Sequence, residues 1–290
     1  MKKNTPALLA PATPAPFFII GCVRSGTTML RDILRRHPNL ASPEETHFYR
    51  WAEPFAAPGF MVAVNSPLLR KHREMDGVPE DSFQTILSNA TSRGELTARY
   101  MAEFIRLTKP TATRWFDKTP QNVYGSSMIA HDFPDAKFVH IVRNPVEVVS
   151  SLRLGKIMKI PNLVAGSAYW NEAAVLIHSL KRRNPGRVLE IRYEDFVADP
   201  LKHLKTLLEF IGEPFDPSHF SGIAVRESSH ADESLLTPAE ITKVEALCMW
   251  GRTRYGYTNP DPLLERKARR LAKAMQQGEV PLKKKHRADA

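Results

Sequence analysis

The sequence predicts an α/β fold in three layers, a central, mostly parallel sheet with helices on both faces. Short runs of apolar and β-branched residues alternate along the chain with amphipathic helical stretches. A glycine-bearing loop joins the first of these runs to the first helical stretch. Polar side chains follow directly after the predicted strands, at the edge where open parallel sheets bind their ligands.

The first strand, loop and helix predict an anion-binding site. Phe17 to Ile20 is a short apolar run that predicts a buried strand, and Gly21 to Gly26 predicts a tight loop. Apolar side chains recur at helical spacing from Thr27 onward. The first amides of such a helix lack internal partners, and the helix dipole favours negative charge there.

The loop nearly matches the nucleotide-binding P-loop, G-x-x-x-x-G-K-[ST], so the expected fold is P-loop-like. Gly21 and Gly26 have the right spacing and Thr28 fills the hydroxyl position, but Thr27 replaces the lysine that reaches the β- and γ-phosphates. Because Arg24 supplies a cation earlier in the loop, we expect a phosphate-like ligand that is not a nucleoside triphosphate. A strand–turn–helix corner without a ligand is the alternative.

A pair of carboxylates follows the expected second strand, Asn39 to Ser42, in the sequence PEETHFYR. Glu44 and Glu45, with His47 two residues on, form a candidate acid–base cluster. In an extended segment the two glutamates point to opposite faces, and His47 shares the face of Glu45. A solvated turn is the alternative interpretation.

Three further strands are predicted, at Thr113 to Lys118, Lys137 to Val142 and Arg187 to Arg192. Helices are expected from Pro145, over Ala168 to Lys181, from Pro200 to Gly212, and from Thr237 to Gly251. The carboxyl ends of parallel strands meet at one edge of a sheet. That edge is therefore expected to gather Arg24, Glu45, Lys118, Arg143 and Tyr193.

Composition is that of an ordinary soluble globular chain, with 290 residues of which 42% are hydrophobic. The net charge of +10 favours anionic ligands, among which nucleic acid is one candidate. Cys22 and Cys248 suggest neither a disulfide framework nor a zinc site, so we expect a reducing, cytoplasmic setting. No signal peptide is predicted, and no stretch approaches the ~20 apolar residues of a membrane span.

The motif GCVRSGTTML resembles the 5′-phosphosulfate loop of sulfotransferases, which use 3′-phosphoadenosine 5′-phosphosulfate (PAPS) as donor. KFVHIVRNPVEVVSSL resembles the 3′-phosphate site of that family, IRYEDFVADP resembles its Tyr-Glu-Asp element, and WGRTRYGY matches its C-terminal segment loosely. The resemblance implies that PAPS is bound by Arg24, Ser25, Gly26, Thr27, Thr28, Arg143, Ser151, Tyr193 and Arg252.

The resemblance also bears on the base. Cytosolic small-molecule sulfotransferases use a histidine in a Lys-Thr-His context, where this chain has Pro120. EETHFY is similar to the branch of glycosaminoglycan and protein-tyrosine sulfotransferases, which places a glutamate after the first helix. It implies that Glu45 is the base and that Lys118 contacts the transferring sulfuryl group. From its position on the face of Glu45, His47 is expected to orient the acceptor or to replace Glu45 as the base. Arg24 and Lys118 are expected to stabilise the charge that grows on the bridging oxygen. Because the membrane anchor and luminal cysteines of that branch are missing, we expect a soluble, bacterial-type relative.

The expected function is metal-independent transfer of a sulfuryl group from PAPS to a hydroxyl of a carbohydrate, small molecule or tyrosine. No acidic Mg²⁺ cluster is evident in the sequence, so no metal is expected. One rival is a P-loop kinase or NTPase, which the missing lysine disfavours. The other is a non-catalytic binder of polyanions or nucleic acid, which would not need Glu45 and Lys118 aimed at one point. The acceptor and the oligomeric state stay open.

We expect one α/β domain over residues 17–260, after a mobile leader at 1–16 and before a basic helix and tail at 261–290. Residues 51–110 are the least regular part, with one clear helix near Leu96 to Leu107. We interpret them as an insertion that shapes the acceptor pocket. Their basic run, Arg70 to Arg73, is either a solvated face or a substrate patch.

Overall fold

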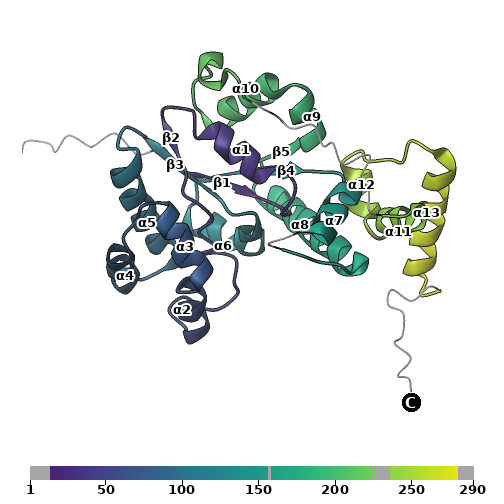
Figure 1. Cartoon of the computed structure of the whole chain (residues 1–290), viewed down its shortest axis with the longest axis horizontal. Helices are drawn as coiled ribbons and strands as arrows, with labels where there is room; N and C mark the ends of the chain where they lie inside the picture. Colours follow the sequence, from purple (N-terminus) through teal and green to yellow (C-terminus); the bar gives the residue numbers. More distant parts are fainter. Residues whose placement is uncertain (1–13, 156–157, 224, 226–235, 280–290) are drawn as a thin grey trace, which may run out of the picture.

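The computed structural model describes residues 14–155, 158–223, 225 and 236–279 (Figure 1). The expected leader up to residue 13 and the lysine-rich tail from residue 280 lie outside these residues. A five-stranded sheet in the order β2-β3-β1-β4-β5 runs through the described part. Its strands are β1 (Phe17–Ile20), β2 (Leu40–Ala41), β3 (Arg114–Lys118), β4 (Lys137–Val142) and β5 (Val188–Arg192).

Every pairing in this sheet is parallel. The central strand, β1, pairs with β3 and β4, so that Ile19 lies opposite Lys118 on one side and Val139 on the other. All of its side chains are buried, which explains the continuous apolar run in the sequence. The register brings the carboxyl ends of β1, β3 and β4 to one edge, as the sequence predicts.

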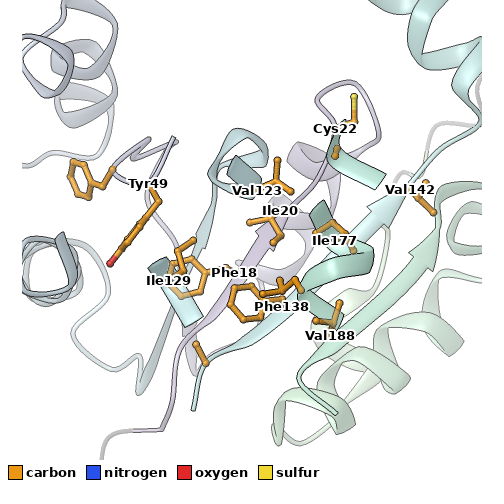
Figure 2. Packing of buried hydrophobic residues seen from close by; sticks show 14 of the residues in the cluster. Phe18, Ile20, Cys22, Tyr49, Val123, Ile129, Phe138, Val142, Ile177 and Val188 are labelled. Atoms are coloured by element: carbon orange, nitrogen blue, oxygen red, sulfur yellow. The ribbon is translucent and has the colours of Figure 1, made fainter. Parts of the chain in front are cut away.

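Helices cover both faces of the sheet, so the expected three-layer architecture is confirmed. Phe17 and Ile19 pack on the side of α1 (Thr27–Leu34), α9 (Tyr193–Ala198) and α10 (Pro200–Ile211). Phe18 and Ile20 point to the other side, against α6 (Ser126–Asp132), α7 (Pro145–Leu154) and α8 (Leu163–Arg183). Figure 2 shows this second cluster, where Phe18 lies beside Phe138 and close to the helices.

Residues 51–110 contain four helices; the one expected near Leu96 to Leu107 is present, but the expectation that the rest is irregular is wrong. They are α2 (Pro58–Val64), α3 (Pro67–Met75), α4 (Glu80–Asn89) and α5 (Arg93–Thr108), and they gather at one end of the sheet (Figure 1). Pro58 and Pro67 stand in the first turn of their helices, where a missing N–H costs nothing. The prolines that suggest irregular chain in the sequence therefore begin helices.

The C-terminal part forms α11 (Pro238–Leu247), α12 (Met249–Arg254) and α13 (Pro262–Gln276) beside α8 (Figure 1). Thr237 and Glu240 make the expected capping box. The single helix predicted up to Gly251 is instead divided at Cys248, and Gly251 lies where an added Cβ would be 2.4 Å from Trp170. Within the described ranges, no helix has the length and hydropathy needed to cross a bilayer.

Candidate active site

The glycine loop between β1 and α1 has a backbone that its glycines allow. Gly26 has a φ of 91°, and an added Cβ would lie 2.5 Å from the ring of Tyr193. A Cβ on Gly21 would lie 2.7 Å from the ring of His140. Arg24 also has a positive φ, of 67°, which is uncommon for a residue other than glycine. The loop is therefore held in a tight, specific shape at the end of the central strand.

Polar groups of the loop lack protein partners. The hydroxyl of Ser25 is buried without a hydrogen-bond partner, and so is Nε of Arg143 from the neighbouring strand end. No side chain caps the start of α1. Buried polar groups are nearly always hydrogen-bonded, so unpartnered donors beside a helix N-terminus fit a phosphate or sulfate ligand.

The two anion sites predicted from the sequence are in direct contact. Nε of Arg24 donates a hydrogen bond to Oγ of Ser151 at 2.9 Å. Nη1 of Arg143 donates to the carbonyl oxygen of Arg24 at 3.3 Å, and its guanidinium lies 4.8 Å from the ring centroid of Tyr193. The loop after β1, Arg143 at the end of β4, Ser151 on α7 and Tyr193 after β5 are therefore connected as one continuous surface.

Arg252 is engaged elsewhere. It is buried, and Nη2 pairs with Glu265 at 2.7 Å and Glu245 at 3.4 Å. It lines a cavity of about 160 Å³ together with Asn144 and Glu147 from the start of α7. Two carboxylates already share the charge of Arg252 through Nη2, whereas its Nη1 is buried without a hydrogen-bond partner in the described part of the chain.

Glu45, Lys118 and Thr28 meet at the other end of the loop. Nζ of Lys118 contacts Oε1 of Glu45 and lies 3.2 Å from Oγ1 of Thr28. Lys118 is 1% exposed, whereas the side chain of Glu45 keeps 25% of its surface accessible. Burial raises the pKa of Glu45, but the hydrogen bond from His47 and the charge of Lys118 outweigh burial and hold the pKa at about 2. Glu45 is therefore ionised at neutral pH.

His47 lies beside the same carboxylate, with Nε2 at 3.3 Å from Oε2 of Glu45. Burial lowers its pKa even though Glu45 opposes this, so the imidazole is neutral near pH 7. A neutral imidazole can bond a carboxylate only through a nitrogen that carries its proton. The nitrogen of His47 that faces Glu45 is therefore a donor, and its other nitrogen, Nδ1, is buried without a partner.

Glu44 is turned away from this cluster. Its carboxylate pairs with Arg31 at 2.6 Å and Arg35 at 3.3 Å, both on α1. Its backbone amide donates to Asp76 at 2.7 Å. The two adjacent glutamates thus point to different partners, as expected.

The residues of the basic run on α3, Arg70 to Arg73, have three different surroundings. Nδ1 of His72 lies 2.8 Å from the carbonyl oxygen of Glu45, so this ring belongs to the site. Arg73 is buried against Glu80, with Nε at 2.9 Å from the carboxylate. Arg70 and Lys71 line a separate hollow. The run is therefore neither a uniform patch nor a uniform solvated face, because successive helical positions point in different directions.

Asp117 is a site residue that sequence reasoning missed. It immediately precedes Lys118 in β3, is fully buried, and accepts hydrogen bonds from the segment that carries Glu45. The signal in the sequence was its place in DKTPQN, next to a lysine already singled out. Among the described residues, no group of three or more His, Cys, Asp or Glu side chains is placed to hold a metal ion.

Comparison with known proteins gives a consistent answer. A model described as the sulfotransferase family matches residues 16–217. The chain is 24% identical over 301 residues to protein-tyrosine sulfotransferase 1 of Danio rerio, covering 89% of this chain and 79% of that protein. It is 25% identical over 305 residues to omega-hydroxy-beta-dihydromenaquinone-9 sulfotransferase Stf3 of Mycobacterium tuberculosis, covering 85% and 76%.

Solved structures extend the comparison to the fold. The sulfotransferase domain of the Synechococcus PCC 7002 olefin synthase superposes with a TM-score of 0.58 at 21% identity, covering 92% of this chain and 97% of that one. This likeness confirms the P-loop-like α/β fold, and the family model covers well over half of the chain. The chain therefore belongs to the sulfotransferase family, and the expected enzyme class, a PAPS-dependent sulfotransferase, is confirmed.

Proposed function

We propose that this sulfotransferase moves a sulfuryl group from PAPS to an acceptor hydroxyl, with Glu45 as general base and without a metal. The observation that carries the proposal is the meeting of Glu45, Lys118 and Thr28 at the end of the glycine loop. A carboxylate, a cation and a helix N-terminus are thereby gathered around one point. Such a set supplies a base and charge stabilisation together.

The donor is proposed to lie along the continuous surface from Thr28 to Ser151. The unpartnered hydroxyl of Ser25 and the amides that begin α1 support the 5′-phosphosulfate position. The unpartnered Nε of Arg143, near Ser151, supports the 3′-phosphate position. Arg252 is the weakest member of this set, because two carboxylates already share its charge.

In the proposed reaction, side chains of this chain take up the proton and stabilise the leaving group. Bound PAPS supplies an electrophilic sulfur and a phosphate leaving group. Glu45 takes the proton of the acceptor hydroxyl while the new oxygen–sulfur bond forms and the bond from sulfur to the bridging phosphate oxygen breaks. Lys118 and Arg24 stabilise the negative charge that grows on that oxygen, which leaves on 3′-phosphoadenosine 5′-phosphate (PAP). The other product is a sulfate ester.

The ion pair of Glu45 with Lys118 suggests how the base becomes active. A carboxylate with a pKa of about 2 is a weak base at neutral pH. Lys118 also touches Thr28 at the loop, so its ammonium group can turn toward an anionic donor. Its departure would raise the pKa of Glu45 and strengthen the base when the donor is in place. His47 faces Glu45 as a hydrogen-bond donor, which favours Glu45 over His47 as the base.

The acceptor is proposed to be a hydroxyl of a carbohydrate, small molecule or tyrosine. The relatives are named for protein tyrosine and for a dihydromenaquinone, so hydroxyls of different kinds occur among them. Residues 51–110 are proposed to shape the acceptor pocket, which the contact between His72 and the carbonyl of Glu45 supports. A cytoplasmic location is proposed from Cys22 and Cys248, which are both buried and free.

The test is transfer of ³⁵S from labelled PAPS to a panel of tyrosine peptides, phenols, oligosaccharides and extracted metabolites. We expect a labelled ester that still forms in EDTA. Loss of transfer in EDTA and its recovery with Mg²⁺ would overturn metal independence. Thermal shifts with PAP, ATP–Mg²⁺ and oligonucleotides separate the rivals, since a ligand stabilises the fold that binds it. Stabilisation by ATP–Mg²⁺ or oligonucleotides but not by PAP would contradict the proposed donor.

A further inference from the structure

Asp117 is the buried centre of a hydrogen-bond network under the proposed base. It is 0% exposed and forms no ion pair with a basic side chain within the described part of the chain. Three side chains donate to its carboxylate: Thr46 at 2.5 Å, Thr119 at 2.7 Å and Asn122 at 3.1 Å. A buried carboxylate without a cation persists only where such donors satisfy it.

Backbone amides fix the direction of these hydrogen bonds. The amide of Thr46 donates to Oγ1 of Thr119 at 3.0 Å, so the hydroxyl proton of Thr119 is left for Asp117. The amide of Tyr49 donates to Oδ1 of Asn122 at 3.2 Å, so the NH₂ end of Asn122 faces Asp117. A backbone amide nitrogen can only donate, so the side-chain amide of Asn122 has a single orientation, and the hydroxyl oxygen of Thr119 already serves as an acceptor for Thr46.

Asp117 accepts from the NH₂ group of Asn122, which can only donate, and as an ionised carboxylate it also accepts from the hydroxyls of Thr46 and Thr119. A protonated Asp117 would have one acceptor position fewer for these three groups. Burial raises its pKa to about 6, against the hydrogen bonds from Thr46 and Thr119, and a pKa of that value still leaves a carboxylate at neutral pH. Aspartate is the residue that supplies two acceptor oxygens and no donor at this size.

This network connects the two halves of the proposed catalytic pair. Glu45 immediately precedes Thr46, and Lys118 immediately follows Asp117. The hydrogen bonds of Thr46 to Asp117 and Thr119 thus attach the segment that bears Glu45 to the strand that bears Lys118. The contact between Glu45 and Lys118 depends on the position of the segment that bears Glu45, and the hydrogen bonds of Thr46 fix that position on β3.

We propose that Asp117 is a positioning residue for sulfuryl transfer: as a carboxylate that only accepts, it fixes the segment after Glu45 on β3 and so sets Glu45 against Lys118. The inference rests on the proposed function. Because Asp117 is fully buried, it acts through the placement of Glu45 and not through a contact of its own with a ligand. Substitution of Asp117 should therefore lower kcat and leave the affinities for PAPS and PAP unchanged.

The test compares matched substitutions. Asp117→Asn keeps the shape but replaces one acceptor oxygen with a donor, and Thr46→Val removes one hydroxyl with less risk to folding. Glu213→Gln is the control for the first, because Glu213 is a buried carboxylate that pairs with Arg114 at 2.7 Å, at the end of β3 opposite to Lys118. Thr97→Val is the control for the second, because buried Thr97 donates to the carbonyl of Arg93 in α5.

We expect kcat to fall about 10–100-fold in Asp117→Asn and less in Thr46→Val, since small misplacements of a catalytic group cost up to about 10²-fold. The double variant should lose less than the product of the single losses, because both changes break one network. The KM for PAPS and the Kd of PAP should stay within about twofold of wild type, as expected for a loss confined to the transition state.

Two results would overturn the inference. One is a kcat loss in Asp117→Asn and Thr46→Val no larger than in their controls. The other is a loss of PAP affinity that matches the loss of kcat, which would indicate general damage to the fold. If Asp117→Asn does not fold, Thr46→Val against Thr97→Val decides. Wild-type protein that transfers nothing from PAPS would overturn the proposed function together with this inference.

Discussion

Two sides of the site are built in opposite ways. The donor side consists of the loop Gly21–Thr28 with Arg143, Ser151 and Tyr193, and it leaves buried donors without partners at Ser25 and Arg143. The base side consists of the segment 43–50 with Lys118 and Asp117, and its carboxylates are saturated with donors. Nδ1 of His47 is the exception on the base side, buried and unpartnered.

The contrast indicates that the two sides act at different steps, the donor side when PAPS binds and the base side when the proton is transferred. Unpartnered buried donors are costly, so the donor side gains most when an anion arrives. On the base side only Lys118 is proposed to change partner when the donor binds. The hydrogen-bond network of Asp117 is already arranged, and the base side contributes when the proton moves. Substitutions on the donor side should therefore change affinity, and those on the base side should change rate.

The largest effect is expected on the base side. Glu45→Gln removes the proposed proton acceptor while keeping the shape, so kcat should fall on the order of 10²–10⁴-fold with PAP affinity nearly unchanged. Glu44→Gln is the matched control, because Glu44 pairs with Arg31 and Arg35 instead. Its kcat should change little, although its melting temperature should drop with the lost ion pairs. Steady-state transfer of ³⁵S measures both.

A substitution at His47 tests the assignment of Glu45 as the base most sharply. If His47→Ala abolishes transfer while Glu45→Gln remains active, histidine is the base and the assignment is wrong. The measured tautomer of His47, from ¹⁵N NMR shifts, gives an independent check. We expect its proton on Nε2, the nitrogen that lies 3.3 Å from Glu45.

A second effect is expected on the donor side. PAP should bind more tightly than AMP, because charge-assisted hydrogen bonds to its 3′-phosphate are worth about 1.5–3 kcal/mol each, or roughly 10–100-fold in Kd. Arg143→Gln should erase most of that preference. Arg106→Gln is the control, since Arg106 forms only an exposed pair with Glu103 among the contacts found in the described residues. Equal Kd values for PAP and AMP by calorimetry would contradict the donor assignment.

A third prediction isolates the shape of the loop. Gly26 and Gly212 both have left-handed φ values, 91° and 83°, but a Cβ on Gly212 would meet nothing within 4 Å. Gly212→Ala should therefore cost about 1–2 kcal/mol of unfolding free energy, which is the strain of the conformation alone. Gly26→Ala adds the overlap with Tyr193 and should cost about 1–3 kcal/mol more. If urea unfolding gives equal losses of unfolding free energy for Gly26→Ala and Gly212→Ala, the contact between position 26 and Tyr193 is contradicted.

The smallest effect concerns pH. The pKa of Glu45 is depressed to about 2, against ~4.3 in the unfolded chain, so its charged form stabilises the fold above pH ~4.3. That contribution is lost as pH falls toward 2. Between pH ~5 and ~3, wild type should lose about 1–2 kcal/mol of stability relative to Glu45→Gln. A difference in unfolding free energy that stays constant across this range would contradict the depressed pKa.

Much of the donor side could be predicted from the sequence because its signals are local. The apolar run from Phe17, the spacing of Gly21 and Gly26, and the polar residues after each strand are contiguous patterns. Parallel pairing then brings strand ends to one edge without further information. The approach of Arg24 to Ser151, which are 127 residues apart, follows from that topology.

The base side was less predictable because its contacts are distant and have no periodicity. Thr46 and Asp117 are 71 residues apart, and no repeat or motif relates a threonine to a carboxylate at that distance. His72 was hidden within a basic run whose members point in different directions. The helices at Pro58 and Pro67 were hidden because proline indicates a break as readily as a helix start.

One paired measurement tests most directly whether the donor side sets affinity and the base side sets rate. We would determine kcat and the Kd of PAP for Glu45→Gln and Arg143→Gln on the same preparations. We expect a crossed result, in which Glu45→Gln lowers kcat and keeps the affinity for PAP, while Arg143→Gln lowers the affinity by a larger factor than it lowers kcat. Parallel losses of rate and affinity in both variants would contradict it.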